Sequence, residues 1–259
     1  MNRNLYIFDS HSHYTDAAFD HDRDALLAGF PEKGIVRCMI CGTDLETSAA
    51  CADLAARFPD LLIAAVGIHP ETPDAPAGYL DVLRKAAEDP LVHAIGEIGL
   101  DYHYENYDRA QQIRLLREQL TLAKSLDLPV ILHCRDAIGD MIRILHEFAP
   151  LNGVMHCFPG SPETAKEVLD MGLYIGFTGV ITFKNAKKPL AALRSVPLDR
   201  LLIETDCPYM APVPYRGKRC DSTMLTETAA VMAREKGVST EEICRITAEN
   251  AARLFRVTL

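Results

Sequence analysis

Histidine and carboxylate residues stand at the ends of several short apolar segments. The first such group is Asp9-Ser10-His11-Ser12-His13, which follows the apolar run Leu5-Tyr6-Ile7-Phe8. Residues two apart on a strand point to the same face, so His11 and His13 would project side by side. Two imidazoles placed in this way can form half of a metal site. A pair of surface histidines beyond a strand end fits the two residues equally well, so the later segments decide.

Further candidate ligands follow later apolar runs. These residues are His69, Glu97, His133, His156 and Asp206. Four of the strand-end histidines together with the two carboxylates make a mixed nitrogen and oxygen set that suits one or two divalent transition ions. The other histidines (His21, His93, His103 and His146) do not follow this pattern.

The elements that would position these residues alternate between strand and helix. The candidate strands are residues 5–9, 35–41, 62–67, 93–99, 129–133, 153–156, 174–177 and 200–205. Several are continuous Val, Ile and Leu runs, as parallel strands buried on both faces should be. Residues 109–126 carry an apolar stripe typical of a helix. Ser161 before Pro162 predicts a helix start, and Ser239 with Glu242 predicts a capping box that opens the last helix.

Eight strands that alternate with helices favour a (β/α)8 TIM barrel, formed as a single domain over residues 1–259. A doubly wound open sheet is the alternative, but no G-x-G-x-x-G follows the first strand. Active sites of such barrels lie at the C-terminal ends of the strands. The candidate ligands fall at these ends.

Composition excludes some classes of protein. A formal charge of -9 argues against a broad electropositive surface for nucleic acid, although it leaves room for a local site. The 8 cysteines are scattered, and the Cys38-x-x-Cys41 pair runs along a predicted strand instead of opening a helix, so we interpret them as structural thiols and not as a redox centre. With no signal peptide and no apolar run of about 18 residues, we expect a cytoplasmic protein without membrane contact.

The segments that carry these residues resemble the TatD-related metal-dependent DNases of the amidohydrolase superfamily. The similar segments are residues 9–13, 67–70, 96–102, 128–137, 156–158, 204–209 and 250–255. They occur in the order of the family and span nearly the whole chain. The resemblance therefore implies a (β/α)8 barrel of the metal-dependent hydrolase type.

The resemblance also implies two adjacent divalent ions, which could be Zn, Mn, Mg or Fe. His11, His13, Glu97 and Asp206 would hold one ion. Glu97, His133 and His156 would hold the other, so that Glu97 bridges through its two oxygens. Related amidohydrolases often use a carboxylated lysine at this bridge, and the strand around Glu97 has no lysine.

Two cations about 3.5–4 Å apart would activate a water and polarise a phosphoryl oxygen. The expected activity is that of a deoxyribonuclease, a 3′-5′ exonuclease on DNA ends, with Asp206 as general base beside Glu97. His69 is the expected phosphate contact at the mouth. Arg135, Arg216 and Lys218 would hold phosphates farther out, and a solvated loop is the alternative for the last two.

Two other functions remain open. One is a hydrolase of small esters, amides or phosphates with the same dinuclear site, which the acidic charge favours. The other is a metal-binding module without catalysis, which the complete ligand set and Asp206 disfavour. The expected partner is thus a DNA end or a small phosphodiester or ester, and no obligate protein partner is evident.

Two segments depart from the family pattern, and three other polar residues allow more than one interpretation. Pro159 and the run Cys220-Asp221-Ser222 are the departures, and we expect both on the substrate side. Asp101 would orient a ligand histidine or cap a local turn, and Asp136 would equally well support the site or cap a helix beside His133. His103 would be an ordinary loop residue or reach the substrate.

Overall fold

A ring of eight parallel strands forms the centre of the computed structural model, which describes residues 5–72 and 75–259. The strands are β1 (Ile7–Ser12), β2 (Ile35–Cys41), β3 (Leu62–Val66), β4 (Val92–Asp101), β5 (Val130–Arg135), β6 (Gly153–Met155), β7 (Tyr174–Phe177) and β8 (Leu201–Ile203). Each strand pairs in parallel with the next. The ring closes where Ser12 of β1 bridges Cys207, just beyond β8. The predicted (β/α)8 barrel is confirmed.

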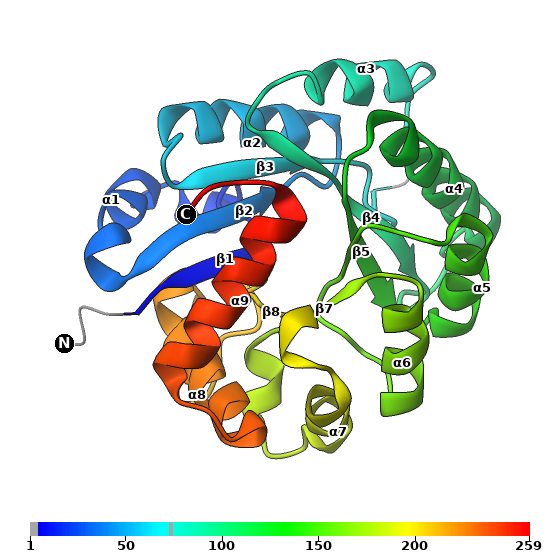
Figure 1. Ribbon diagram of the computed structural model, residues 1–259. Helices are drawn as coiled ribbons and strands as arrows, with labels where there is room; N and C mark the ends of the chain where they lie inside the picture. The colour runs from blue at the N-terminus through cyan, green and yellow to red at the C-terminus, as the bar shows by residue number, and fades with distance from the viewer. Residues whose placement is uncertain (1–4, 73–74) are drawn as a thin grey trace.

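Helices follow the strands and surround the ring (Figure 1). They are α1 (Arg23–Ala28), α2 (Leu45–Arg57), α3 (Tyr79–Ala86), α4 (Arg109–Leu126), α5 (Ile138–Phe148), α6 (Pro162–Asp170), α7 (Lys187–Ser195), α8 (Leu225–Lys236) and α9 (Thr240–Phe255). The helix predicted over 109–126 has the same bounds in the structure. Ser161 and Ser239 cap α6 and α9, each accepting a backbone N–H three residues on. For Ser239 this is one half of the predicted capping box, and among the described residues no return bond from the Glu242 side chain accompanies it.

Several strand ends differ from the sequence prediction. β1 was expected to end at Asp9, but it continues to Ser12 and so includes His11. The β1–β2 register shifts after Asp9, and beyond this shift His11 O accepts the backbone N–H of Asp206 at 3.0 Å. Partners just beyond β8, which lies next to β1 in the closed ring but far from it in sequence, therefore prolong the strand, and no local pattern encodes them. β4 likewise extends to Asp101, while β8 is shorter than expected.

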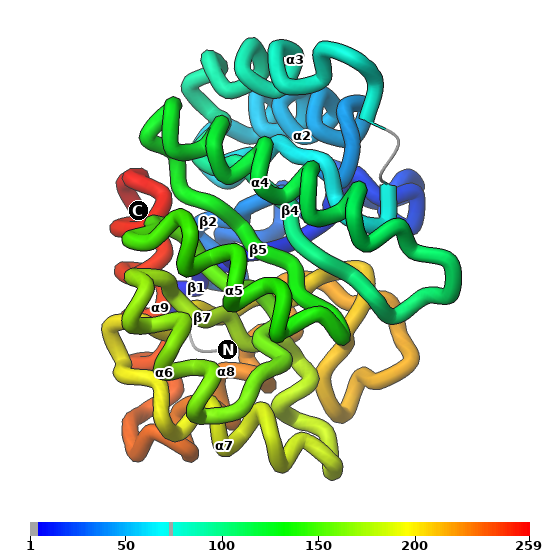
Figure 2. The backbone as a smooth tube through the Cα atoms, turned by 90° about the vertical axis from the view of Figure 1, so that its right-hand side faces the viewer, coloured from blue at the N-terminus to red at the C-terminus, as the bar shows by residue number. Residues whose placement is uncertain are grey.

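The interior of the barrel is packed at one end by α9. Alternate strand residues such as Ile131, Val154 and Leu202 form a buried cluster with Leu254 and Phe255 of α9. Figure 1 shows α9 lying across the ring of strands. Figure 2 shows the loops that follow β4 and β8 projecting on the side away from the C-terminus. This leaves the carboxyl ends of the strands free to form a site.

Strand periodicity places ligands above this packed layer. His133 and His156 each come two residues after an interior residue, Ile131 and Val154, and so share its face. Gly99 of β4 is needed beside them, because a Cβ there would lie 1.9 Å from His133 O. Among the described residues no helix is both long and apolar enough to cross a membrane. The organisation of residues 1–259 as one domain stays a prediction.

Candidate metal centre

The predicted ligands converge on the buried carboxylate of Glu97, which is 2% exposed. Its Oε2 lies 3.2 Å from His11 Nε2 and 3.5 Å from His13 Nε2. Its Oε1 lies 2.7 Å from His156 Nε2 and 2.9 Å from His133 Nδ1. The two oxygens of one carboxylate therefore face two different pairs of histidines.

Asp206 completes the first of these groups. Its Oδ1 lies 3.4 Å from His13 Nε2 and 3.6 Å from His11 Nε2. Asp206 has a φ of +60°, and this left-handed residue three positions beyond β8 aims its side chain at the histidines. Four groups of three residues could each hold an ion, because within each group the possible ligand atoms lie within 4.8 Å of one another. The groups are His11–Glu97–His156, His11–His13–Asp206, His69–Glu97–His133 and Glu71–Asp101–His133. The structure thus brings all six predicted ligands together.

The hydrogen-bond pattern around His13 fits a cation. Its Nδ1 lies 3.0 Å from the carbonyl oxygen of Cys41, and because a carbonyl only accepts, Nδ1 must carry the hydrogen. In the neutral ring, Nε2 then presents a lone pair toward His11 Nε2 at 3.0 Å and toward the oxygens of Glu97 and Asp206. A proton or a cation can be shared among these atoms.

The same pattern recurs around His133. Its Nε2 lies 2.9 Å from Asp101 Oδ2, which fixes the hydrogen on Nε2. Nδ1 of the neutral ring then faces Glu97 Oε1 and, at 3.3 Å, His156 Nε2. Asp101 Oδ1 also accepts the backbone N–H of His103 at 2.9 Å. Asp101 therefore holds the His133 ring and also caps the local turn.

Electrostatics keep the carboxylates of this cluster ionised. Burial raises the pKa of Glu97, but the surrounding histidines hold it well below the usual value. Burial opposes charge on His13, yet its hydrogen bond to Asp206 raises its pKa to about 9. For His133, the bonds to Asp101 and Glu97 likewise outweigh burial and raise the pKa to about 10. The cluster binds positive charge, which protons or a divalent cation can supply.

A buried glutamate that was not singled out from the sequence lies beneath the cluster. Glu204 is fully buried and accepts the backbone N–H of Cys157 at 2.5 Å and the hydroxyl of Ser10 at 3.3 Å. Its Oε1 lies 3.7 Å from His156 Nδ1. Gly176 makes room for it, since a Cβ there would lie 2.3 Å from Glu204 Oε2. The available signal was an acidic residue directly after the apolar strand β8.

Asp9 forms a second support. It is fully buried and accepts the backbone N–H and the hydroxyl of Thr205, at 3.0 and 2.7 Å, and the hydroxyl of Ser222 at 2.6 Å. Tyr14 OH lies 2.6 Å from the same serine hydroxyl. The expectation that residues 220–222 face substrate is therefore wrong for Ser222, because this contact draws it beneath the site. Pro159, the other departure, does line the cavity.

Asp136 does not cap a helix, which was one of its two interpretations. The residue at the N-cap of α5 is Ala137, which makes no side-chain cap bond. The Asp136 carboxylate instead lies 2.8 Å from Nδ1 of the exposed His103. The Cys38 and Cys41 thiols are buried in β2, which raises the pKa of both well above the usual value and fits structural thiols.

A cavity of about 770 Å³ opens over the cluster. Of the predicted site residues, it is lined by His13, His69, Glu97, His133, Arg135, His156 and Asp206. Arg216 and Lys218 lie outside this lining. The Arg216 guanidinium packs over the ring of Phe183 at 4.5 Å, and the Lys218 ammonium lies 5.8 Å from the centre of the Tyr215 ring.

His69 is oriented as a hydrogen-bond donor. It is 8% exposed, and its Nδ1 accepts the backbone N–H of Glu71 at 3.1 Å. Burial lowers its pKa, which keeps the ring neutral with its hydrogen on Nε2. Nε2 lies 3.4 Å from Glu97 Oε1. His69 thus offers an N–H at the wall of the cavity.

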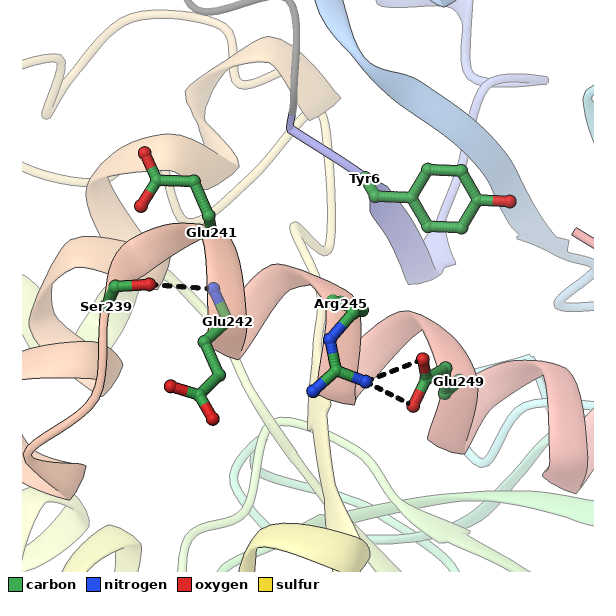
Figure 3. Close-up of a pocket in the computed structure, with 6 residues that line it drawn as sticks. All are labelled: Tyr6, Ser239, Glu241, Glu242, Arg245 and Glu249. Atoms are coloured by element: carbon green, nitrogen blue, oxygen red, sulfur yellow. Dashed lines mark hydrogen bonds and ion pairs between the residues drawn. The ribbon is translucent and has the colours of Figure 1, made fainter.

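A second hollow, of about 600 Å³, lies on the surface of α9 beside Tyr6 (Figure 3). Its polar side chains include Glu242, Arg245 and Glu249. Arg245 Nη1 donates to both carboxylate oxygens of Glu249, at 2.7 and 2.9 Å. None of the candidate metal groups found among residues 5–72 and 75–259 includes a residue of this hollow. The candidate chemistry therefore belongs to the first cavity.

Comparison with known proteins gives one consistent result. The family model described as TatD related DNase matches residues 8–256. The chain is 39% identical to "Uncharacterized metal-dependent hydrolase YabD" of Bacillus subtilis, covering 97% of this chain and 99% of that protein. It is 35% identical to "3'-5' ssDNA/RNA exonuclease TatD" of Erwinia tasmaniensis, covering 97% and 100%. The crystal structure of YjjV, a TatD homologue from Escherichia coli, superposes with a TM-score of 0.91 at 32% identity, covering 97% and 98%.

Proposed function

The chain belongs to the TatD-related DNase family, and from that premise we propose that it is a metal-dependent hydrolase that removes nucleotides from the 3′ ends of single-stranded nucleic acid. The observation that carries the proposal is the convergence of four histidines and two carboxylates, whose nitrogen and oxygen atoms approach one another to between 2.7 and 3.6 Å. All of these residues except His11 line a cavity at the carboxyl ends of the barrel strands.

The proposed ligands form two groups that share one residue. His11, His13, Glu97 and Asp206 are assigned to one divalent ion. Glu97, His133 and His156 are assigned to the other. Bound divalent cations lower the pKa of a water and polarise a phosphoryl oxygen. A donor set of imidazoles and carboxylates suits Zn, Mn or Fe better than Mg.

The side chains of the cavity supply positioning and proton transfer. Asp206, ionised and accessible from the cavity, is placed to orient the attacking water and accept its proton. His69 is placed to donate its Nε2 hydrogen to a phosphate oxygen. Asp101 holds the His133 ring in the tautomer that leaves Nδ1 free.

The shape of the cavity supports a single-stranded end as substrate. Its volume lies within the roughly 300–1,000 Å³ of small-ligand sites, so it suits a terminal nucleotide and not a duplex. Tyr104 and Tyr209 line it and are 54% and 57% exposed. They follow β4 and β8, which are opposite each other in a ring of eight strands. Exposed aromatic rings are the surfaces on which unpaired bases stack.

The experiment compares labelled nucleic acids with small esters. Purified protein is incubated with 5′-labelled and 3′-labelled single-stranded DNA and RNA, and with generic phosphate and carboxylate esters, in Mg, Mn or Zn and with a chelator. We expect metal-dependent release of the label from 3′-labelled strands at once, and progressive shortening of 5′-labelled strands. Asp206→Asn should keep the fold and lose a factor of about 10²–10⁴ in rate, while the exposed Asp136→Asn serves as control.

The other outcomes identify the alternatives. Cleavage of small esters alone would replace the nuclease by a small-ester hydrolase, which the formal charge of -9 favours. Absence of turnover with every metal, together with tight metal binding, would leave a binding module.

A further inference from the structure

Among the described residues, basic side chains that form no ion pair stand at or after the ends of β5, β7 and β8, the strands whose carboxyl ends and following segments supply Arg135, Pro189 and Tyr209 to the cavity wall. We call them the basic rim: Arg135, Lys184, Lys187, Lys188, Arg216 and Lys218. In the described part of the chain, no carboxylate oxygen lies within 4.0 Å of their charged nitrogens. Elsewhere most arginines are paired, such as Arg109 with Asp140 at 2.6 Å and Arg194 with Glu235 at 2.7 Å. The basic rim is thus an excess of free positive charge on an acidic protein.

The contacts of the loops make the basic rim continuous. Arg216 packs over Phe183, the residue before Lys184, and Val213 donates its backbone N–H to Thr182 Oγ1 at 2.9 Å. These contacts join the loop after β8 to the loop after β7.

The rim then continues toward β5 and β4. Burial raises the pKa of the Cys134 thiol in β5, and the nearby Lys188 opposes this rise. Pro189, next to Lys188, lines the cavity. The Arg135 guanidinium lies 5.3 Å from the centre of the Tyr104 ring, in the loop after β4. The basic rim therefore forms an arc along the carboxyl ends of β5, β7 and β8 that ends at Tyr104.

Carboxylates also line the cavity, and each has a partner nearby. Asp16 Oδ2 accepts the hydroxyl of Tyr209 at 3.3 Å. Burial raises the pKa of Glu71, and Arg135 is close enough to oppose that rise. Asp136, next to Arg135 in the chain, is paired with His103. The attraction for a polyanion therefore comes from the unpaired cations of the basic rim.

We propose that the basic rim binds the phosphates of the strand that leads away from the scissile bond, so that the substrate is a single strand several nucleotides long. This inference rests on the proposed function and adds the substrate length and the path of the strand. Lysine and arginine contacts to phosphates release counterions and read no base sequence. Cleavage should therefore depend on strand length and on salt, and little on sequence.

The position of two of the lysines offers an independent readout. Lys187 and Lys188 open α7, whose first turn has no acidic residue. The helix dipole disfavours positive charge there and favours a carboxylate. Replacing these lysines by glutamate should therefore maintain or raise the melting temperature. If strand binding falls in the same variant, the loss does not come from misfolding.

The experiment uses two matched triple variants of the full-length protein. The rim variant is Lys184→Glu/Lys187→Glu/Lys188→Glu. The control is Lys33→Glu/Lys85→Glu/Lys124→Glu, which changes the charge equally near the amino ends of β2, β4 and β5. Binding of a labelled single strand of roughly a dozen nucleotides is measured by anisotropy at several salt concentrations, and kcat/KM is measured for that strand and for a dinucleotide.

We expect the wild type and the control to prefer the longer strand. The rim variant should bind it at least about tenfold more weakly, with a log–log salt slope reduced by about 2 for three lost phosphate contacts. The ratio of kcat/KM between the long strand and the dinucleotide should fall accordingly.

Two results overturn the inference. Either the rim variant matches the control in affinity and salt slope, or both variants lose affinity equally. If wild type cleaves strands while the rim variant matches the control, the proposed function stands and the basic rim does not. If wild type binds strands through the rim yet cleaves only small esters, the proposed function fails and the rim stands.

Discussion

Asp101 Oδ2 lies 2.9 Å from His133 Nε2, on the side of the ring away from Glu97. The aspartate is itself fixed, because the side-chain amide of Gln112 bonds to its backbone N–H at 2.9 Å and to its carbonyl at 2.8 Å. Burial raises the pKa of Asp101, but the hydrogen bond with His133 outweighs burial and lowers this pKa to about 2. The carboxylate therefore remains a hydrogen-bond acceptor. One fixed carboxylate thus determines which nitrogen of His133 faces the proposed metal.

The first prediction tests this relationship. Asp101→Asn should weaken the affinity for one of the two ions by about 10–100-fold, because the ring loses its orienting acceptor. Competition with a fluorescent chelator measures the affinity of each ion. Asp136→Asn, which alters a neighbouring exposed carboxylate, is the control. Equal ion affinities in Asp101→Asn and wild type would contradict the prediction.

The second prediction concerns the two ligand groups. His11 contacts Glu97 and Asp206, whereas His133 contacts Glu97 from the other side. His11→Ala should therefore release one ion at a lower chelator concentration than the other, and His133→Ala should weaken the opposite ion. Elemental analysis after dialysis against graded chelator measures the remaining ions per chain. Loss of both ions at one chelator concentration in both variants would show that the groups are not separable.

Most of the barrel could be predicted from the sequence because its signals are local. Continuous apolar runs give the parallel strands, and the cap residues Ser161 and Ser239 give the helix starts. The proposed ligands could be grouped because the carboxyl ends of parallel strands meet at one end of a barrel. The end of β1 could not be predicted, since His11 O bonds to a residue 195 positions later in the chain, Asp206.

Features that depend on contacts between distant parts of the chain could not be predicted from the sequence. The local sequence around Ser222 predicts a loop, but its side chain is buried against Asp9 and Tyr14. Glu204 looks like the polar end of a strand, yet it is fully buried. The composition also does not reveal the unpaired cations of the basic rim, because a net charge of -9 does not tell which charges are paired in space.

The third prediction concerns pH. Hydrogen bonds from Arg109, with those from Tyr102 and Arg143, hold the pKa of Asp140 well below its usual value. A lowered carboxylate pKa adds stability above the unfolded value of about 3.9, and this stability is lost as the pH falls toward the folded pKa. Asp140→Asn should therefore lower the free energy of unfolding at pH 7 by up to about 1 kcal/mol.

The difference between Asp140→Asn and wild type should shrink as the pH falls below about 3.9. Urea unfolding at several pH values measures it. Asp170→Asn, which removes an exposed pair with Lys166, is the control and should show little change at any pH. A deficit of Asp140→Asn that stays constant down to low pH would indicate lost packing and not lost charge.

The fourth prediction separates a phosphate contact from a metal ligand at His69. Its Nδ1 accepts the Glu71 backbone N–H, so the neutral ring has its hydrogen on Nε2, the nitrogen that faces the cavity wall and Glu97. An N–H fits a phosphate oxygen and cannot ligate a cation. His69→Ala should therefore keep both ions while kcat/KM on single-stranded DNA falls about 10–100-fold, the effect expected for one hydrogen bond to a charged group. His69→Gln, which retains an N–H, should recover part of this loss. If His69→Ala instead loses an ion, the ring is a ligand and the group His69–Glu97–His133 defines that ion's position.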